Sequence, residues 1–158
     1  MMKKLFVLRH AQSAGKQSRQ RDYDRDLTAV GEAKAKALGQ KIKKANINID
    51  LILSSDAVRT RRTVAFLNET LQLTEAKIQF ETELYDALLI EWIDKIHKLP
   101  DEVQVVMVVG HNPALSMLAT KFHHTLVDLE PCELMAFEFD VNSWDEIENT
   151  AQEILNIK

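Results

Sequence analysis

Two histidines and two arginines each lie just past the end of a short apolar run of the chain: Arg9, His10, Arg59 and His111. An imidazole has an ordinary pKa of about 6.5, so one histidine can act as a neutral nucleophile while another donates a hydrogen bond. A guanidinium stays ionised, and its planar fork holds two phosphoryl oxygens at once. If these side chains meet, they are suited to binding and transferring a phosphoryl group.

The apolar runs that precede these residues have the length of buried strands. Residues 3–8, 50–53 and 103–109 are almost continuously apolar, which is typical of parallel strands covered on both faces. Helical patterns separate them, so the sequence predicts an α/β fold, a three-layer α/β/α sandwich with a mostly parallel central sheet. Ligands of such sheets bind beyond the carboxyl ends of the strands, which would bring the histidines and arginines to one edge.

Capping residues indicate where the helices begin. A side-chain oxygen before the first turn, or a proline within it, is the usual start signal, and a later proline is a stop signal. Four helices are predicted in this way: from Thr28 to near Ala45, from the cap Ser55, over residues 88–99 before Pro100, and from Asn112 and Pro113 to about His123.

The last part of the chain is less regular. Residues 133–139 alternate apolar and polar side chains, which predicts a more exposed strand, antiparallel at one side of the sheet. Residues 143–146 fit one helical turn. Residues 151–157 fit either a helix end or a last edge strand.

Length and composition indicate one globular domain over residues 1–158, with 46% hydrophobic and 28% charged residues. Twenty Lys and Arg against 24 Asp and Glu give a net charge of -4, which argues against a nucleic-acid-binding surface. The apolar run at residues 5–8 is too short for a signal peptide, and no stretch is long enough to cross a bilayer. We therefore expect a cytoplasmic protein with no membrane partner.

Cys132 is the only cysteine, so it is expected to be a small buried side chain.

Each of the chemical features also has an ordinary structural explanation. Arg59, Arg61 and Arg62 could form a solvated helix face, and residues 110–112 a capped turn between a strand and a helix. The adjacent His123 and His124 do not have the spacing of two metal ligands on one helix face, so no metal site is expected. The joint occurrence of the other features at one predicted edge favours the phosphate site.

Four segments resemble motifs of the histidine phosphatase superfamily, whose fold is called phosphoglycerate mutase-like. Residues 109–113 (VGHNP) are similar to its second histidine motif, and the order, spacing and short length look closest to the SixA-type phosphohistidine phosphatases. The resemblance runs from Lys3 to about Phe139. The other three segments are residues 8–13 (LRHAQS), like the RHG or RHA signature, residues 24–31, like the lead into the first helix, and residues 54–60 (SSDAVRT), like the S-x-x-x-R-x-x-x-T element.

The resemblance implies a two-step transfer. His10 would attack the phosphoryl group, form a phosphohistidine and be released by water, with Arg9 and Arg59 holding the oxygens and His111 completing the pocket. No metal or organic cofactor is implied. The other candidates are Asp86 or Glu83 as an acid that protonates the leaving group, and Ser13, Arg25, Gly110 and Asn112 as substrate-binding residues.

The function expected from this resemblance is a phosphatase acting on phosphohistidine of a protein. One alternative is a broad phosphomonoesterase for small molecules, and a mutase is disfavoured because the chain is short for the lid that such an enzyme needs. A further alternative is a phosphate-binding module without turnover. Because a protonated imidazole cannot attack, turnover is expected to fall at acid pH.

Overall fold

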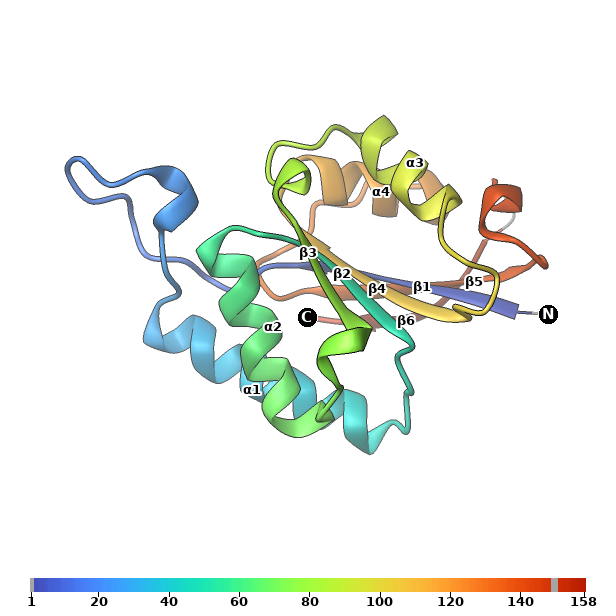
Figure 1. Ribbon diagram of the computed structural model, residues 1–158, viewed down its shortest axis with the longest axis horizontal. Helices are drawn as coiled ribbons and strands as arrows, with labels where there is room; N and C mark the ends of the chain where they lie inside the picture. The colour runs from blue at the N-terminus through green and yellow to red at the C-terminus, as the bar shows by residue number, and fades with distance from the viewer. Residues whose placement is uncertain (1, 149–150) are drawn as a thin grey trace.

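The computed structural model describes residues 2–148 and 151–158 and contains a six-stranded sheet flanked by helices on both faces (Figure 1). The helices are α1 (Ala29–Lys44), α2 (Val58–Leu71), α3 (Leu89–His97) and α4 (Ala114–His123). The strands are β1 (Met2–Arg9), β2 (Leu51–Ser55), β3 (Ile78–Glu81), β4 (Val105–Gly110), β5 (Leu134–Asp140) and β6 (Gln152–Ile157). Four short 3-10 turns are η1 (Asp22–Asp24), η2 (Glu75–Lys77), η3 (Thr82–Leu84) and η4 (Trp144–Glu146).

The sheet has the strand order β3-β2-β4-β1-β5-β6. β1 and β2 both pair in parallel with β4, and β2 pairs in parallel with β3. β5 is antiparallel to both of its neighbours, so it is the strand that runs against the others in the described part of the chain. The predicted three-layer sandwich with a mostly parallel sheet is confirmed. No helix within the described residues has the length and hydrophobicity needed to cross a bilayer.

Each face of the sheet buries its own apolar core, because successive strand residues point to opposite faces. On one face, Phe6 and Leu8 of β1 pack with residues of α1 and α2 such as Leu38 and Leu67. Leu5 and Val7 point the other way, into a core formed with α3, α4 and η4. Figure 1 shows α1 and α2 below the sheet and α3 and α4 above it.

The beginnings of the helices agree with the sequence in part. Thr28 is the N-cap of α1, and its hydroxyl accepts a hydrogen bond from the Gly31 N–H at 3.0 Å. The prediction that Ser55 caps the second helix is wrong: Ser55 is the last residue of β2, and α2 begins three residues later, after Ala57. The Asn112 side chain does accept a hydrogen bond from a first-turn N–H of α4, although the cap residue itself is Pro113.

The strands near the two sheet edges differ most from expectation. β3 has no counterpart in the prediction, because its four residues, IQFE, are too few and too polar to stand out. β5 is antiparallel as predicted but mostly buried rather than exposed, because its side chains point alternately into the two apolar cores on the faces of the sheet. Residues 143–146 include the predicted turn, η4, and of the two alternatives for the tail the structure has the edge strand β6.

The strand register brings the carboxyl ends of β1, β2 and β4 to a common level. Arg9 lies opposite Gly110, and Ser54 lies opposite Val109. The residue after each of these strands therefore leaves the sheet at the same edge, which is where the sequence placed its candidate side chains.

Candidate active site

His10 and His111 meet at this edge of the sheet. Their ring centroids are 5.3 Å apart, although the two residues are 101 positions apart in the sequence. Arg59, from the first turn of α2, lies against the first ring, with its Nε 3.3 Å from His10 Nε2. Three of the four residues that carry the predicted chemistry therefore lie side by side.

His10 is held in one tautomer by the backbone. Its ring is buried, and Nδ1 lies 2.7 Å from the carbonyl oxygen of Ala11. A carbonyl oxygen only accepts hydrogen bonds, so the neutral ring carries its proton on Nδ1, and Nε2 keeps a lone pair. Burial lowers the pKa of His10 to about 4, helped by the positive charges of Arg59, Arg9 and Arg25 and opposed by the bond to Ala11. His10 is thus neutral at pH 7, with Nε2 facing Arg59.

His111 is neutral for similar reasons. Its Nε2 lies 2.8 Å from the hydroxyl of Ser55 at the end of β2. Burial, and then the nearby His10 and Arg59, lower its pKa to about 3. Its Nδ1 is buried and has no hydrogen-bond partner among the described residues. Buried polar atoms nearly always have a partner, so this nitrogen is a candidate for contact with a bound group.

Arg59 makes a fork of contacts with the segment that follows β1. Its side chain is only 6% exposed, and its Nη1 and Nη2 donate to the backbone oxygen and to Oδ2 of Asp22, at 2.8 and 3.0 Å. Thr63, one turn further along α2, accepts from the Ala11 N–H at 3.0 Å and donates to the Arg59 carbonyl at 2.7 Å. These bonds fix α2 against the residue that follows His10.

Arg9 is the last residue of β1 and directly precedes His10. Its Nη1 donates to the carbonyl oxygen of Leu129 at 2.9 Å, and its buried Nε has no partner within the described segments. Burial lowers its pKa, and the charge of Asp128 opposes this. Like Nδ1 of His111, the Arg9 Nε is a buried polar atom with no hydrogen-bond partner in the part of the chain that the structure describes.

Arg25 and Ser13 lie together in the segment between β1 and α1. Nη1 of Arg25 donates to the Ser13 hydroxyl at 3.1 Å, while its Nε donates to Oδ1 of Asp22 at 2.8 Å. Arg25 therefore shares the carboxylate of Asp22 with Arg59, and Ser13 contacts Arg25. Their predicted part in holding a substrate stays a prediction.

Gly110 and Asn112 shape the turn around His111. A Cβ on Gly110 would lie 2.7 Å from Cζ2 of Trp92, so only glycine fits there without a shift. The Asn112 amide donates to the Leu129 carbonyl at 3.1 Å and accepts from the Ser116 hydroxyl at 2.6 Å. These contacts are all with the protein, and a contact of either residue with substrate stays a prediction.

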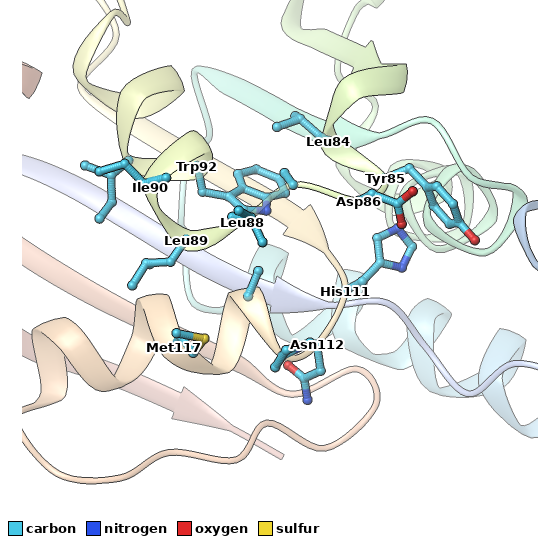
Figure 2. A pocket seen from close by; sticks show the side chains of 14 residues that line it. Leu84, Tyr85, Asp86, Leu88, Leu89, Ile90, Trp92, His111, Asn112 and Met117 are labelled. Atoms are coloured by element: carbon cyan, nitrogen blue, oxygen red, sulfur yellow. The ribbon is translucent and has the colours of Figure 1, made fainter.

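The two candidate acids lie in different surroundings. Asp86 lines the same cavity as His111, and Figure 2 shows it with Tyr85 at one end of that cavity. The exposed Glu83 pairs with Lys95 at 3.0 Å, and its pKa is lowered by a backbone hydrogen bond and then by Lys95. Of the two, Asp86 is the carboxylate beside His111.

The sequence reasoning missed two residues of the site. Asp22 bridges Arg25 and Arg59, and the Tyr85 hydroxyl donates to its carboxylate, while the Tyr85 ring packs edge-on against His111 at 5.4 Å. The hydrogen bond from Tyr85, and then the charge of Arg59, lower the pKa of Asp22 to about 2, although burial raises it. An acidic residue in a charged loop and a lone tyrosine beside the acid candidates carry no pattern that would have separated them from surface residues.

An apolar cavity of about 540 Å³ opens beside His111. It lies between the segment that starts α3 and the first turns of α4 (Figure 2). Trp92 and Leu89 contribute to one wall, and Pro113 and Met117 to the other. His111 stands at its end, so the cavity is continuous with the phosphate-binding candidates.

Comparison with known proteins agrees with this arrangement. A family model described as histidine phosphatase superfamily (branch 1) matches residues 5–92, more than half of the chain. An uncharacterized chloroplastic protein of Arabidopsis thaliana is 31% identical over 153 residues, covering 91% of this chain and 70% of its own length.

Solved structures with the same fold include two described as "putative phosphohistidine phosphatase SixA". The one from Agrobacterium tumefaciens has a TM-score of 0.84 and 26% identity, covering 99% of this chain and 97% of its own. The one from Nakamurella multipartitia has a TM-score of 0.85 and 22% identity, covering 100% and 96%. A protein histidine phosphatase SixA complexed with tungstate has a TM-score of 0.81 and 18% identity, covering 98% and 96%. The chain therefore belongs to the histidine phosphatase superfamily and has its phosphoglycerate mutase-like fold.

Proposed function

We propose that the protein is a phosphohistidine phosphatase, which removes the phosphoryl group from a histidine of another protein, with His10 as the nucleophile. The observation that carries this proposal is the state of His10: a buried neutral imidazole with its proton fixed on Nδ1 and its Nε2 directed at Arg59. An imidazole in this state needs no base to activate it.

The transfer proceeds in two displacements. The His10 Nε2 lone pair forms a bond to phosphorus as the bond from phosphorus to the leaving nitrogen breaks, and the leaving imidazole keeps that electron pair. Water then attacks the phosphohistidine, and the P–N bond to His10 breaks, which releases inorganic phosphate and restores the free imidazole. Phosphoryl transfer depends mainly on positioning and on compensation of charge. Arg59, with Arg9 and Nδ1 of His111, is assigned to the phosphoryl oxygens.

The apolar cavity supports a protein as the source of the phosphoryl group. Three large apolar side chains at its rim are unusually exposed: Leu88 at 65%, Ile90 at 69% and Met117 at 49%. Exposed apolar groups gathered at a cavity are typical of a surface that another molecule covers. A protein surface around the phosphorylated histidine would cover them, whereas a small polar phosphoester would leave them in water.

Asp86 supports a second candidate, a phosphomonoesterase for small molecules. An alkoxide is a poorer leaving group than an imidazole, which leaves readily once it is protonated, so hydrolysis of a phosphoester benefits from a general acid. Asp86 is the carboxylate that lines the cavity with His111. The two candidates therefore differ in how much they need this residue.

Phosphate release from a histidine-phosphorylated phosphotransfer protein and from a small phosphoester tests both candidates. We expect faster turnover of the phosphoprotein, and Asp86→Asn should slow the ester reaction at least about tenfold more than the phosphohistidine reaction. Glu83→Gln is the matched control, because Glu83 pairs with Lys95 instead. Turnover of the small ester alone would refute the protein-substrate proposal. Undiminished phosphate release by His10→Ala would remove His10 as the nucleophile.

A further inference from the structure

Asp22 occupies the donors that a phosphoryl group would need. Its Oδ2 accepts from Nη2 of Arg59, its Oδ1 accepts from Nε of Arg25, and its backbone oxygen accepts from Nη1 of Arg59. The Tyr85 hydroxyl also donates to Oδ2. A carboxylate and a phosphoryl group present the same kind of acceptor oxygens to a guanidinium fork. The protein thus supplies its own anion to two of the arginines beside His10.

The nucleophile is affected by the same contacts. With two nitrogens of Arg59 held by Asp22, the third, Nε, points at the lone pair of His10 Nε2 from 3.3 Å. A lone pair that accepts a hydrogen bond is less available for attack. The guanidinium must therefore turn from His10 toward the phosphoryl oxygens before the bond to phosphorus can form.

The segment that carries Asp22 is partly exposed to solvent. Asp22 lies in η1, within the stretch that joins β1 to α1. Residues 15–19 of this stretch are exposed, and Figure 1 shows it extending from the body of the molecule beyond α1 and α2. The Asp22 side chain itself is 45% exposed, so water can take over its oxygens when it leaves. Such a loop opens at a small cost compared with any part of the sheet.

From these contacts we infer that Asp22 is an internal competitor of the substrate: it occupies Arg25 and Arg59 in the free enzyme and is displaced by the incoming phosphoryl group. This inference rests on the proposed function and adds a determinant of specificity to it. An anion gains access only if it binds the two guanidinium groups better than the tethered carboxylate does. A phosphoryl dianion has three oxygens for these donors, whereas a carboxylate has two, so the competition favours phosphoryl groups over carboxylates.

Tungstate, a tetrahedral dianion, serves as the probe in isothermal titration of the full-length protein at fixed salt. We expect Asp22→Asn to lower the Kd for tungstate about tenfold, because the charge-assisted bonds that compete with it are removed. Asp24→Asn is the matched control: it removes one charge from the same turn, but the Asp24 carboxylate pairs with Arg21 instead of Arg25 or Arg59. The Kd of this variant should change by less than about twofold.

Tyr85→Phe separates displacement from a simple change of charge. This variant keeps every charge but removes the hydroxyl that holds Asp22, so under displacement it also binds tungstate more tightly than the wild type. Hydrogen–deuterium exchange gives a readout that does not depend on affinity. Under displacement, saturating tungstate should speed exchange in residues 14–26 of the wild type.

The outcomes separate this inference from the function on which it rests. Weaker tungstate binding by Asp22→Asn, with slower exchange in residues 14–26 on binding, would assign Asp22 to holding Arg59 in place and overturn the displacement alone. Tighter binding by Asp22→Asn with unchanged or weaker binding by Tyr85→Phe would assign the effect to charge and also overturn it. If neither the wild type nor Asp22→Asn bound tungstate, the proposed function would fall, and this inference with it.

Discussion

The pKa of His10 determines how far into the acid range the enzyme can work. At pH 5.5 an ordinary imidazole with a pKa of 6.5 is neutral in only about one molecule in ten. With a pKa of about 4, His10 is neutral in roughly 97% of molecules at that pH. The structure therefore predicts about ten times more competent nucleophile at pH 5.5 than the sequence alone would suggest. Protonation of His10 should therefore reduce the activity only when the pH approaches 4.

Two measurements test this prediction. Long-range proton–nitrogen NMR spectra of uniformly labelled protein follow the ring nitrogens of each histidine across pH 3.5–8, and His10→Ala assigns the resonance. The same protein unfolded in urea gives the reference near 6.5. Single-turnover formation of the phosphoenzyme, followed by rapid quenching at each pH, reports whether the chemical step has the same midpoint.

A midpoint near 6.5 for the His10 ring would contradict the argument from burial and from the neighbouring arginines. Arg59→Met gives a further check, because Arg59 is the charged group with the largest effect on His10. Removing that charge should move the midpoint upward toward 6.5. A downward movement would show that the guanidinium acts on the ring in some other way.

Three further predictions concern stability. Since unfolded His10 and His111 bind a proton near pH 6.5 and the folded residues only near pH 4 and pH 3, the unfolded state holds more protons between pH 6.5 and 4, so the free energy of unfolding in urea falls as pH falls across this window, with roughly 3 kcal/mol contributed by each histidine. Thr63→Val leaves the Ala11 N–H without its acceptor and should lower the free energy of unfolding in the same assay by about 1–3 kcal/mol. A decrease below about 0.5 kcal/mol would contradict this prediction. Gly39→Ala places a Cβ 2.8 Å from the Leu67 carbonyl oxygen and should lower the Tm, whereas Gly15→Ala, with nothing within 4 Å, should leave it unchanged.

The main groups of the site were predictable because their positions follow from topology. His10 and His111 follow β1 and β4, and the carboxyl ends of neighbouring parallel strands lie at one edge. Arg59 was predictable because it lies in the first turn of the helix that follows β2. Strands and helices of this kind are encoded locally, by apolar runs and caps, so their ends can be read from the sequence.

Contacts made by loops could not be predicted in the same way. Asp22 reaches Arg59 across 37 residues of sequence, and Tyr85 reaches Asp22 across 63, with no repeated pattern in either segment. The sequence also led to the wrong role for Ser55, whose hydroxyl contacts His111 instead of starting α2. The hydrogen-bond partner of a polar side chain in a loop depends on the conformation of that loop, and no periodic pattern in the sequence predicts that conformation.

The position of β4 affects how the site forms during synthesis. β4 is the fourth strand in the chain but lies between β2 and β1, which do not pair with one another. While a ribosome has released only the first hundred residues, β1 and β2 have no strand to join them, so the sheet that positions His10 and Arg59 is incomplete. We expect nascent chains that end before β4 to be unable to bind phosphate, and this capacity to appear together with the completed sheet rather than by degrees.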